Sequence, residues 1–154
     1  MADTQVAEMW PVPKFHFVVN VDGTEIAFQE VSGLDQETDI MEYRDGDSPV
    51  FSTIKQPGLV KFTNIVCKKG VYQGDARLTD LFQALIKDKA RYHNQARMEI
   101  KIQLLDELAA PVITWTARNC FPVKLQGTDL KSDASEVSIE TIEFAIEGLE
   151  AEYA

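Results

Sequence analysis

Apolar and polar residues alternate over several stretches of this chain, with the period of two that is typical of β-strands. The alternation over 14–21 stops at Asp22-Gly23 and resumes over 24–31. Asp-Gly readily adopts positive φ, so the pattern predicts a tight hairpin between two antiparallel strands. The stretch 97–104 is the clearest two-faced strand, because every second residue in it is apolar.

Further runs of this kind predict strands at 36–44, 60–69, 111–116 and 123–125, and a last strand that begins near Glu136. In the last strand the apolar positions change parity between Ile139 and Ile142. A slip of one residue turns every later side chain to the opposite face, so we expect a β-bulge near Glu140–Thr141.

One segment has helical periodicity, and Asp75 is its expected N-cap. Its apolar residues recur at intervals of three and four and form one stripe: Leu78, Leu81, Phe82, Leu85 and Ile86. We therefore predict a single domain, 1–154, with a mainly β fold. It is expected to be a β-barrel or sandwich of seven to eight antiparallel strands, with one flanking α-helix at about 76–92.

Two segments fall outside these elements. Residues 1–12 form an acidic N-terminal arm that contains Trp10, and residues 45–58 form a long loop. Structureless loops of more than about 12 residues are uncommon in compact domains and are usually functional or mobile. Four glycines are expected at sharp turns, where they permit positive φ: Gly23, Gly33, Gly46 and Gly58.

The composition excludes several functions. The chain has 154 residues and a formal net charge of −10. This negative charge disfavours binding to nucleic acid or to an anionic membrane surface. We see no export signal at the start, and no stretch approaches the roughly 18 apolar residues that cross a bilayer. Cys67 and Cys120 lack metal-ligand spacing. We therefore expect reduced, buried thiols in a protein that is made in the cytoplasm and is not anchored in a membrane.

Signatures of catalysis are missing as well. The chain has no phosphate-binding loop, no nucleophile elbow and no zinc-protease motif. His16 and His93 are expected to be solvated, because a general base needs a partner and a pocket. Asp45-Gly46-Asp47 lacks the regular oxygen ligands and the closing Glu of an EF-hand. We expect no enzymatic activity, no metal and no cofactor.

The predicted strands carry few of the devices that protect sheet edges, since prolines stay at strand ends and Lys is not concentrated in mid-strand. This pattern favours the hypothesis that strands of neighbouring copies complete each other's sheets. A monomeric β-barrel that binds a small ligand in its interior is the alternative from a different class. An enzyme on this scaffold is disfavoured, because the catalytic constellation is absent.

Eight short stretches, in this order and spacing, together resemble the tail-tube family of contractile phages and phage-like injection systems. They are Trp10–Phe17, Phe28–Leu34, Glu42–Gly46, Lys55–Gly58 with Lys61, Lys69-Gly70, Arg118–Pro122, Asp129–Asp133 followed by Glu136-Val137, and Ile139–Glu143. The chain is most similar to the inner-tube subunits of extracellular contractile injection systems of the antifeeding-prophage type. The relation to the tube proteins of secretion systems is expected at the level of the fold.

The resemblance implies a tail-tube-type β-barrel subunit that forms homohexameric rings, which stack into a hollow tube. A sheath surrounds the tube and propels it by contraction. The expected partners are further copies, the sheath protein, baseplate, spike and terminator proteins, and effector cargo in the lumen. The resemblance also implies a particle that is assembled in the bacterial cytoplasm and then released from the cell. A tube-initiator or terminator paralogue near the baseplate and a phage tail-tube protein are the alternatives.

Two groups of residues follow as candidates for assembly. Contacts between subunits or rings are expected at Trp10, Tyr43, Arg44, Asp45, Pro49, Phe51, Lys55 and Pro57. A polar lumen lets cargo slide, and the candidates to line it are Glu99, Lys101, Gln103, Glu143 and Glu147.

Overall fold

The computed structural model describes residues 16–47, 49–87, 97–128, 130–132 and 137–154, which contain ten β-strands and one α-helix. The strands are β1 (Phe17–Val21), β2 (Thr24–Ile26), β3 (Glu30–Ser32), β4 (Gln36–Tyr43), β5 (Ile54–Phe62), β6 (Ile65–Gly70), β7 (Met98–Leu105), β8 (Pro111–Gln126), β9 (Ile139–Ala145) and β10 (Gly148–Tyr153). The helix α2 (Arg77–Lys87) lies between β6 and β7. The mainly β fold with one helix is thus confirmed, although residues 88–92 of the predicted helix lie outside the described residues.

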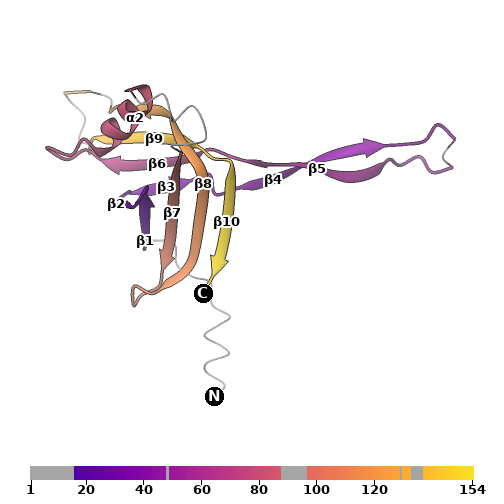
Figure 1. The fold of residues 1–154 in the computed structure, drawn as a ribbon, viewed down its shortest axis with the longest axis horizontal. Coiled ribbons are helices and arrows are strands. Elements are labelled where there is room, and N and C mark those ends of the chain that lie inside the picture. Colours follow the sequence, from indigo (N-terminus) through magenta and orange to yellow (C-terminus); the bar gives the residue numbers. More distant parts are fainter. Residues whose placement is uncertain (1–15, 48, 88–96, 129, 133–136) are drawn as a thin grey trace, which may run out of the picture.

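Eight strands belong to one antiparallel sheet in the order β2-β1-β7-β8-β9-β6-β3, and β10 pairs with β8 beside this path. The sheet bends at β8, whose first half pairs with β7 and β10 and whose second half pairs with β9. In Figure 1, β1, β7, β8 and β10 run side by side as the first layer, and β9, β6 and β3 cross them as the second layer. No pairing joins β2 to β3 among the described residues, so the sheet is folded over rather than closed as a barrel.

The core lies between the two layers. Strand β7 alternates buried and exposed side chains as its sequence predicts, and Ile100 and Ile102 are buried on its inner side. Phe144 from β9 is fully buried from the second layer, and Leu78 is fully buried from α2. The helix packs against β8. Burial of these apolar side chains is the main force that holds the layers together.

The hairpin predicted at Asp22-Gly23 is confirmed. Both residues have positive φ, 51° and 84°, as a two-residue turn of type I′ requires, and Val21 pairs with Thr24. The predicted strand 24–31 is wrong in its length, because β2 ends at Ile26 and the chain then crosses to the second layer. There the Gln29 amide donates to the Lys68 carbonyl at 2.7 Å, and β3 pairs with β6.

The C-terminal strands differ from the prediction in four ways. The two runs 111–116 and 123–125 are parts of one 16-residue strand, β8. The bulge expected at Glu140–Thr141 is absent, since β6 and β9 pair without interruption, and the register shift lies at Val123 on β8 instead. Val137 is 78% exposed and precedes the strand, so it does not belong to the alternation. Strand β10 was not predicted.

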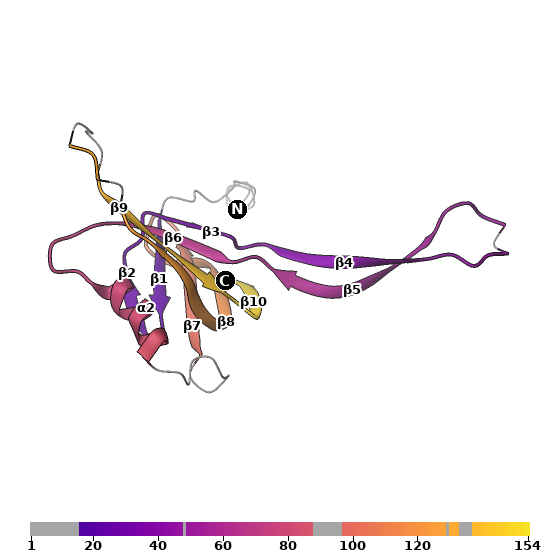
Figure 2. The same ribbon diagram turned by 90° about the horizontal axis from the view of Figure 1, so that it is seen from above.

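The prediction of a long loop at 45–58 is also wrong, because the second part of this segment is a β-strand. β5 begins at Ile54 and runs through Lys55, Gln56, Pro57 and Gly58, paired with β4. Residues 36–62 therefore form one long hairpin, which extends away from the rest of the molecule (Figures 1 and 2). We call this segment the hairpin and the remainder of the described chain the body.

The four glycines have different roles. Gly23 and Gly33 have positive φ, and a Cβ on Gly33 would lie 2.0 Å from the Asn64 carbonyl oxygen. The prediction of positive φ is wrong for Gly46 and Gly58. At Gly58 the space is still limited, because a Cβ would lie 3.0 Å from the carbonyl oxygen of Asp39.

Candidate assembly surfaces

The hairpin is a two-stranded ribbon with no third strand beside it. Its ladder runs from Gln36 paired with Phe62 to Tyr43 paired with Ile54. Each strand therefore has one edge whose amides and carbonyls lack a strand partner within the described chain. A two-stranded ribbon is marginally stable in water, so such a ribbon is stabilised when it packs against another surface.

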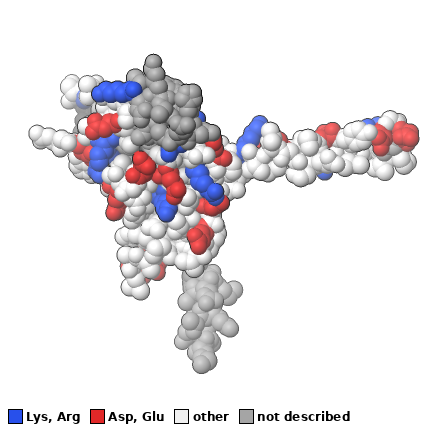
Figure 3. Space-filling view, in the orientation of Figure 1, with Lys and Arg blue, Asp and Glu red and all other residues white. Residues whose placement is uncertain are grey.

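The hairpin concentrates the exposed apolar side chains of the molecule. Among the described residues, eight of the fifteen exposed large hydrophobic residues belong to it: Ile40, Met41, Tyr43, Val50, Phe51, Ile54, Leu59 and Val60. Figure 3 shows uncharged atoms along most of its length, with charged atoms near its root, about midway and at its tip. Large exposed apolar areas mark interaction sites in soluble proteins, so we take the hairpin as the main candidate surface.

Both faces of the ribbon are apolar in part. Residues that pair across a ladder share a face, so Ile40 and Pro57 lie on one face, and Tyr43 and Ile54 lie on the other. Met41 shares the face of Tyr43, two residues away. Packing against a single partner would cover one face only. The hairpin is therefore suited to lie between two other surfaces.

A bulge divides the hairpin near its root. The register shifts between Thr38 and Ile40, so that Gly58 and Leu59 on β5 lie opposite Asp39 alone. The Lys61 Nζ lies 3.0 Å from an oxygen of Asp39 at this point. Bulges increase local twist and redirect the strand, and this one sits where the hairpin leaves the body.

The tip of the hairpin is held by its own side chains. Arg44 lies over the ring of Phe51 at 5.8 Å from the centroid, and its Nε donates to the Val50 carbonyl at 3.1 Å. The hydroxyl of Tyr43 donates to Asp45, and this bond raises the pKa of Tyr43. These contacts order the tip while they leave Phe51 96% exposed.

The structure brings most of the predicted contact residues together. Seven of them lie in the hairpin: Tyr43, Arg44, Asp45, Pro49, Phe51, Lys55 and Pro57. Trp10 lies outside the described residues. Sequence reasoning missed the apolar residues of β5, such as Ile54 and Leu59, because Gln-Pro-Gly at 56–58 interrupts the alternation that would have revealed this strand. That these residues contact other copies remains a prediction.

The outer side of the first layer is a second candidate surface. Glu99 and Lys101 are exposed and Gln103 is half-buried on this face of β7. Across the sheet, Lys101 pairs with Asn20 on β1 and with Thr116 on β8, and Thr116 pairs in turn with Glu150 on β10. A row of polar side chains thus runs across four strands.

The two remaining lumen candidates lie elsewhere. Glu143 is on β9 in the second layer, where it accepts a hydrogen bond from the Asn64 amide at 3.3 Å. Glu147 follows β9, accepts from the Asn119 amide at 3.1 Å and lies 3.5 Å from Arg97. The five candidates therefore do not share one face, and only the three on β7 belong to the polar row.

Strand β10 ends the first layer, and no other described strand pairs with its outer edge, where the Gln36 side chain donates to the Leu149 carbonyl at 3.3 Å. The Ala154 amide donates to the Val112 carbonyl at 2.9 Å, and the ladder alternates from there. The amides of Glu150 and Glu152 therefore point to β8, and those of Ala151 and Tyr153 point away from the sheet. The opposite end of the layer is formed by β2.

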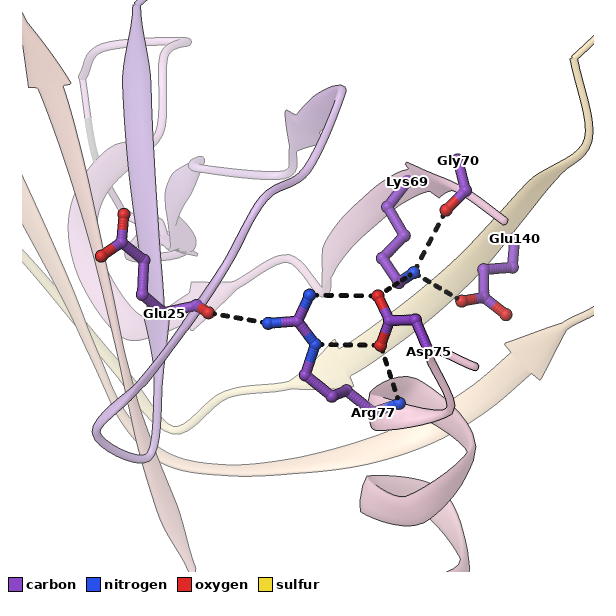
Figure 4. A network of polar contacts seen from close by, with 6 residues as sticks. All are labelled: Glu25, Lys69, Gly70, Asp75, Arg77 and Glu140. Atoms are coloured by element: carbon purple, nitrogen blue, oxygen red, sulfur yellow. Dashed lines mark hydrogen bonds and ion pairs between the residues drawn. The ribbon is translucent and has the colours of Figure 1, made fainter. Parts of the chain in front are cut away.

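A buried charge network fastens α2 to the body (Figure 4). Lys69 on β6 has a fully buried side chain whose Nζ lies 3.0 Å from Asp75 and 3.1 Å from Glu140. Arg77 donates twice to Asp75 and once to the Glu25 carbonyl, so the network also joins the β1–β2 hairpin. The Arg77 amide donates to Asp75 at 3.3 Å, which agrees with the predicted cap.

The network shifts the acidity of its members. The bonds from Arg77 and Lys69 hold the pKa of Asp75 well below its usual range. Burial alone would lower the pKa of Lys69, but its bonds to Asp75 and Glu140 outweigh this effect and raise it. Loss of one partner would leave a buried charge uncompensated, so the network holds the helix and the sheet in their native arrangement.

Groups suited to chemistry are few in the described part of the chain. Cys67 and Cys120 are buried, and burial raises the pKa of each thiol to about 12. The described residues contain no cluster of three or more His, Cys, Asp or Glu side chains placed to hold a metal ion. Within the same residues, no helix has the length and apolar character needed to cross a membrane.

An open-edged sheet and a projecting apolar hairpin are both surfaces that bind other proteins. Together they are typical of subunits of a larger protein assembly. The family follows from the sequence as a whole. This chain belongs to the T4-like virus tail tube protein gp19 family, whose model matches residues 13–150. The resemblance inferred from the eight short stretches is thereby confirmed. None of the curated proteins matches the chain significantly.

Solved structures agree with this membership. A chain of the PVC sheath–tube complex, an extracellular contractile injection system in its extended state, is 28% identical, with a TM-score of 0.85 over 100% of this chain and 99% of that chain. A chain of the anti-feeding prophage cap, which terminates the tube, is 26% identical, with a TM-score of 0.83 over 95% and 93%. Hcp1 from Flavobacterium johnsoniae is 12% identical, with a TM-score of 0.55 over 90% and 95%, and shares the fold alone.

Proposed function

We propose that this protein is the repeating inner-tube subunit of a contractile injection system, in which six copies form a ring and rings stack into a hollow tube. Its similarity over the full chain to a protein of the PVC sheath–tube complex supports this role. A sheath, a baseplate with its spike and a tube terminator are the expected partners. The machine is assembled in the cytoplasm and acts as a released particle.

The outer edge of β10, to which no other described strand is paired, carries the proposal. A β-strand with unpaired amides on one side is a template for another strand, and identical copies related by rotation offer the other end of the layer in return. We place the β2 end of the next copy against β10, so that the first layers of all copies close into one cylinder.

The same arrangement assigns the lumen. The polar row of Asn20, Lys101, Thr116 and Glu150 lies on the side of the first layer that faces away from the core. Hydrated side chains of both charges and neutral hydroxyls give cargo few apolar sites to adhere to. Glu99 and Gln103 line the lumen in this proposal, whereas Glu143 and Glu147 do not.

Proline substitutions in β10 test ring closure. Ala151→Pro removes an amide that points away from β8, so we expect a folded monomer that no longer forms rings. Glu152→Pro removes an amide that points to β8, so the matched variant should lose stability as well. Thermal unfolding and negative-stain microscopy of both variants measure the two effects. Rings of normal shape from Ala151→Pro would refute the pairing through β10.

A tube terminator is the second candidate, because the chain is also similar to the anti-feeding prophage cap. A terminator stops polymerisation, whereas a tube subunit propagates it. Microscopy of the purified wild-type protein distinguishes them, since long tubes identify the repeating subunit and single rings identify the terminator. A wild-type protein that stays monomeric at high concentration contradicts both.

A further inference from the structure

We infer that Gln36 and Arg77 determine the register in which strands of neighbouring copies pair. Each side chain donates to a backbone carbonyl on an outer edge of the sheet, one at each end of the first layer, and so closes part of that edge to another strand. We call these two hydrogen bonds the edge caps. The inference rests on the proposed function, because it requires that the first layers of different copies pair.

At the β10 end, the capped carbonyl is that of Leu149. The Ala154 amide donates to the Val112 carbonyl at 2.9 Å, so the even-numbered residues of β10 turn their backbone groups to β8. The amide and carbonyl of Leu149 therefore point outward. The Nε2 of Gln36, at the root of the hairpin, donates to this carbonyl at 3.3 Å. A strand that approaches β10 consequently meets an acceptor that is already engaged.

At the opposite end, the capped carbonyl is that of Glu25 on β2. The Asp22 amide donates to the Glu99 carbonyl of β7, so the even-numbered residues of β1 turn their backbone groups to β7. Asn20 is one of these residues and pairs with Glu25, whose amide and carbonyl therefore point away from β1. The Nη1 of Arg77 donates to this outward carbonyl at 3.0 Å (Figure 4).

The charge network holds Arg77 in place for this bond. Its Nε and Nη2 donate to the two carboxylate oxygens of Asp75 at 2.9 and 3.0 Å, and Asp75 in turn lies 3.0 Å from the buried Lys69 Nζ. A planar guanidinium can bind a carboxylate with one side of its fork and a carbonyl with the other, which an ammonium group cannot do in the same geometry. The network thus fixes an edge cap as well as the helix.

The two edge caps lie at the same end of the first layer. Pairing across its four strands places Leu149 in one row with Val21, and Glu25 pairs with the residue before Val21. At the other end of the layer, Tyr153 shares a row with Phe17, and β2 ends before it reaches that row. Rotation about the tube axis turns the same end of every copy to the same rim of a ring. The uncapped parts of neighbouring edges therefore face each other.

An additional device of this kind is required because alternation alone does not fix the register. A slip of two residues leaves every side chain on its original face, since the side-chain period of a strand is two. With the edge caps in place, a strand that slips toward Leu149 meets an engaged carbonyl and leaves one of its own amides without an acceptor. An unpaired amide in an interface is costly, so the slipped register is disfavoured.

Substitutions of Gln36 test the inference, because this residue is exposed and its replacement leaves the core intact. Gln36→Met keeps the length of the side chain and removes the donor. We expect a monomer that unfolds at the wild-type temperature but loses uniform assembly and forms rings of mixed size. Gln36→Lys retains a donor and should restore uniform rings. Gln126→Met, the same replacement at an exposed position of β8, is the matched control and should give uniform rings.

Arg77→Lys tests the other end of the layer. It keeps a positive charge beside Asp75 but lacks the fork that also reaches Glu25, so we expect rings of mixed size here as well. Thermal unfolding and negative-stain microscopy of the full-length variants supply the measurements.

Uniform rings from Gln36→Met or from Arg77→Lys would overturn the role of that residue and leave the proposed function intact. A folded Gln36→Met protein that forms no rings would also overturn the inference, because an edge cap restricts pairing and does not create it. Rings of mixed size from Gln126→Met would do the same, since added apolar surface would then be the cause. A wild-type protein that stays monomeric would refute the proposed function and, with it, the inference.

Discussion

Strands β5 and β6 follow each other in the chain and have similar compositions, yet they have opposite environments. Every second residue of β6 is buried, including Lys69, whereas no residue of β5 is buried. The Lys69 side chain is 1% exposed and lies between two carboxylates, and the Lys61 side chain is 65% exposed beside Asp39. Strand β6 has neighbours on both sides in the body, and β5 has one neighbour in the hairpin.

This difference indicates that the body provides the folding stability of the protein and that the hairpin is available for assembly. The body buries its apolar residues within one copy, so it is expected to fold alone. The hairpin keeps its apolar residues exposed, so they contribute little burial to the single copy. A substitution in the body should therefore affect unfolding, and an equivalent substitution in the hairpin should affect assembly only.

The largest contrast is expected between two phenylalanines. Phe144 is fully buried and Phe51 is 96% exposed. Phe144→Ala should lower the free energy of unfolding by about 3–5 kcal/mol, because it leaves a cavity in the core. Phe51→Ala should change it by at most about 0.5 kcal/mol. Urea unfolding of the monomer measures both, and a large loss for Phe51→Ala would show that the hairpin stabilises the single copy.

Two lysines provide the next contrast. Lys69→Met leaves Asp75 and Glu140 without their shared cation, and we expect a loss of about 3 kcal/mol in the free energy of unfolding. Lys61→Met removes an exposed ion pair and should cost at most about 1 kcal/mol. Thermal denaturation of the two variants and the wild type gives the comparison. Equal effects would contradict a structural role for the buried network.

The smallest contrast concerns two glycines at turns. Gly33→Ala places a Cβ against the Asn64 carbonyl at a φ of +90°, and we expect it to cost about 1–3 kcal/mol of folding free energy. Gly46→Ala has open space and an ordinary φ, so its effect should stay within about 0.5 kcal/mol. Urea titrations of both variants test this, and a stronger effect at Gly46 would reverse the expected order.

Local pattern predicted the elements whose signal is contained in their own residues. The turn at Asp22-Gly23, the two faces of β7, the cap of α2 at Asp75 and the mainly β class all follow from short-range rules. The family was predicted from eight dispersed stretches, because their combined order is specific although each is weak. The contact residues at the hairpin tip were predicted as a group, but within a loop.

Elements that depend on distant neighbours were not predicted. Pro57 and Gly58 resemble a loop by composition, but an edge strand tolerates both, so β5 forms where β4 supplies a partner. Pro122 likewise lies within β8, beside a register shift, and two predicted strands became one. Strand β10 has only three apolar residues and depends on pairing with β8.

The sequence by itself determined the period of each segment, the tight turns and the family, because these depend on residues close together in the chain or on their order. Only the tertiary structure decided that Lys69 is buried, that the lumen candidates lie on different layers, and that the hairpin projects from the body. The physical reason is that alternation fixes which side chains share a face, whereas burial depends on what lies against that face. That neighbour comes from another part of the chain.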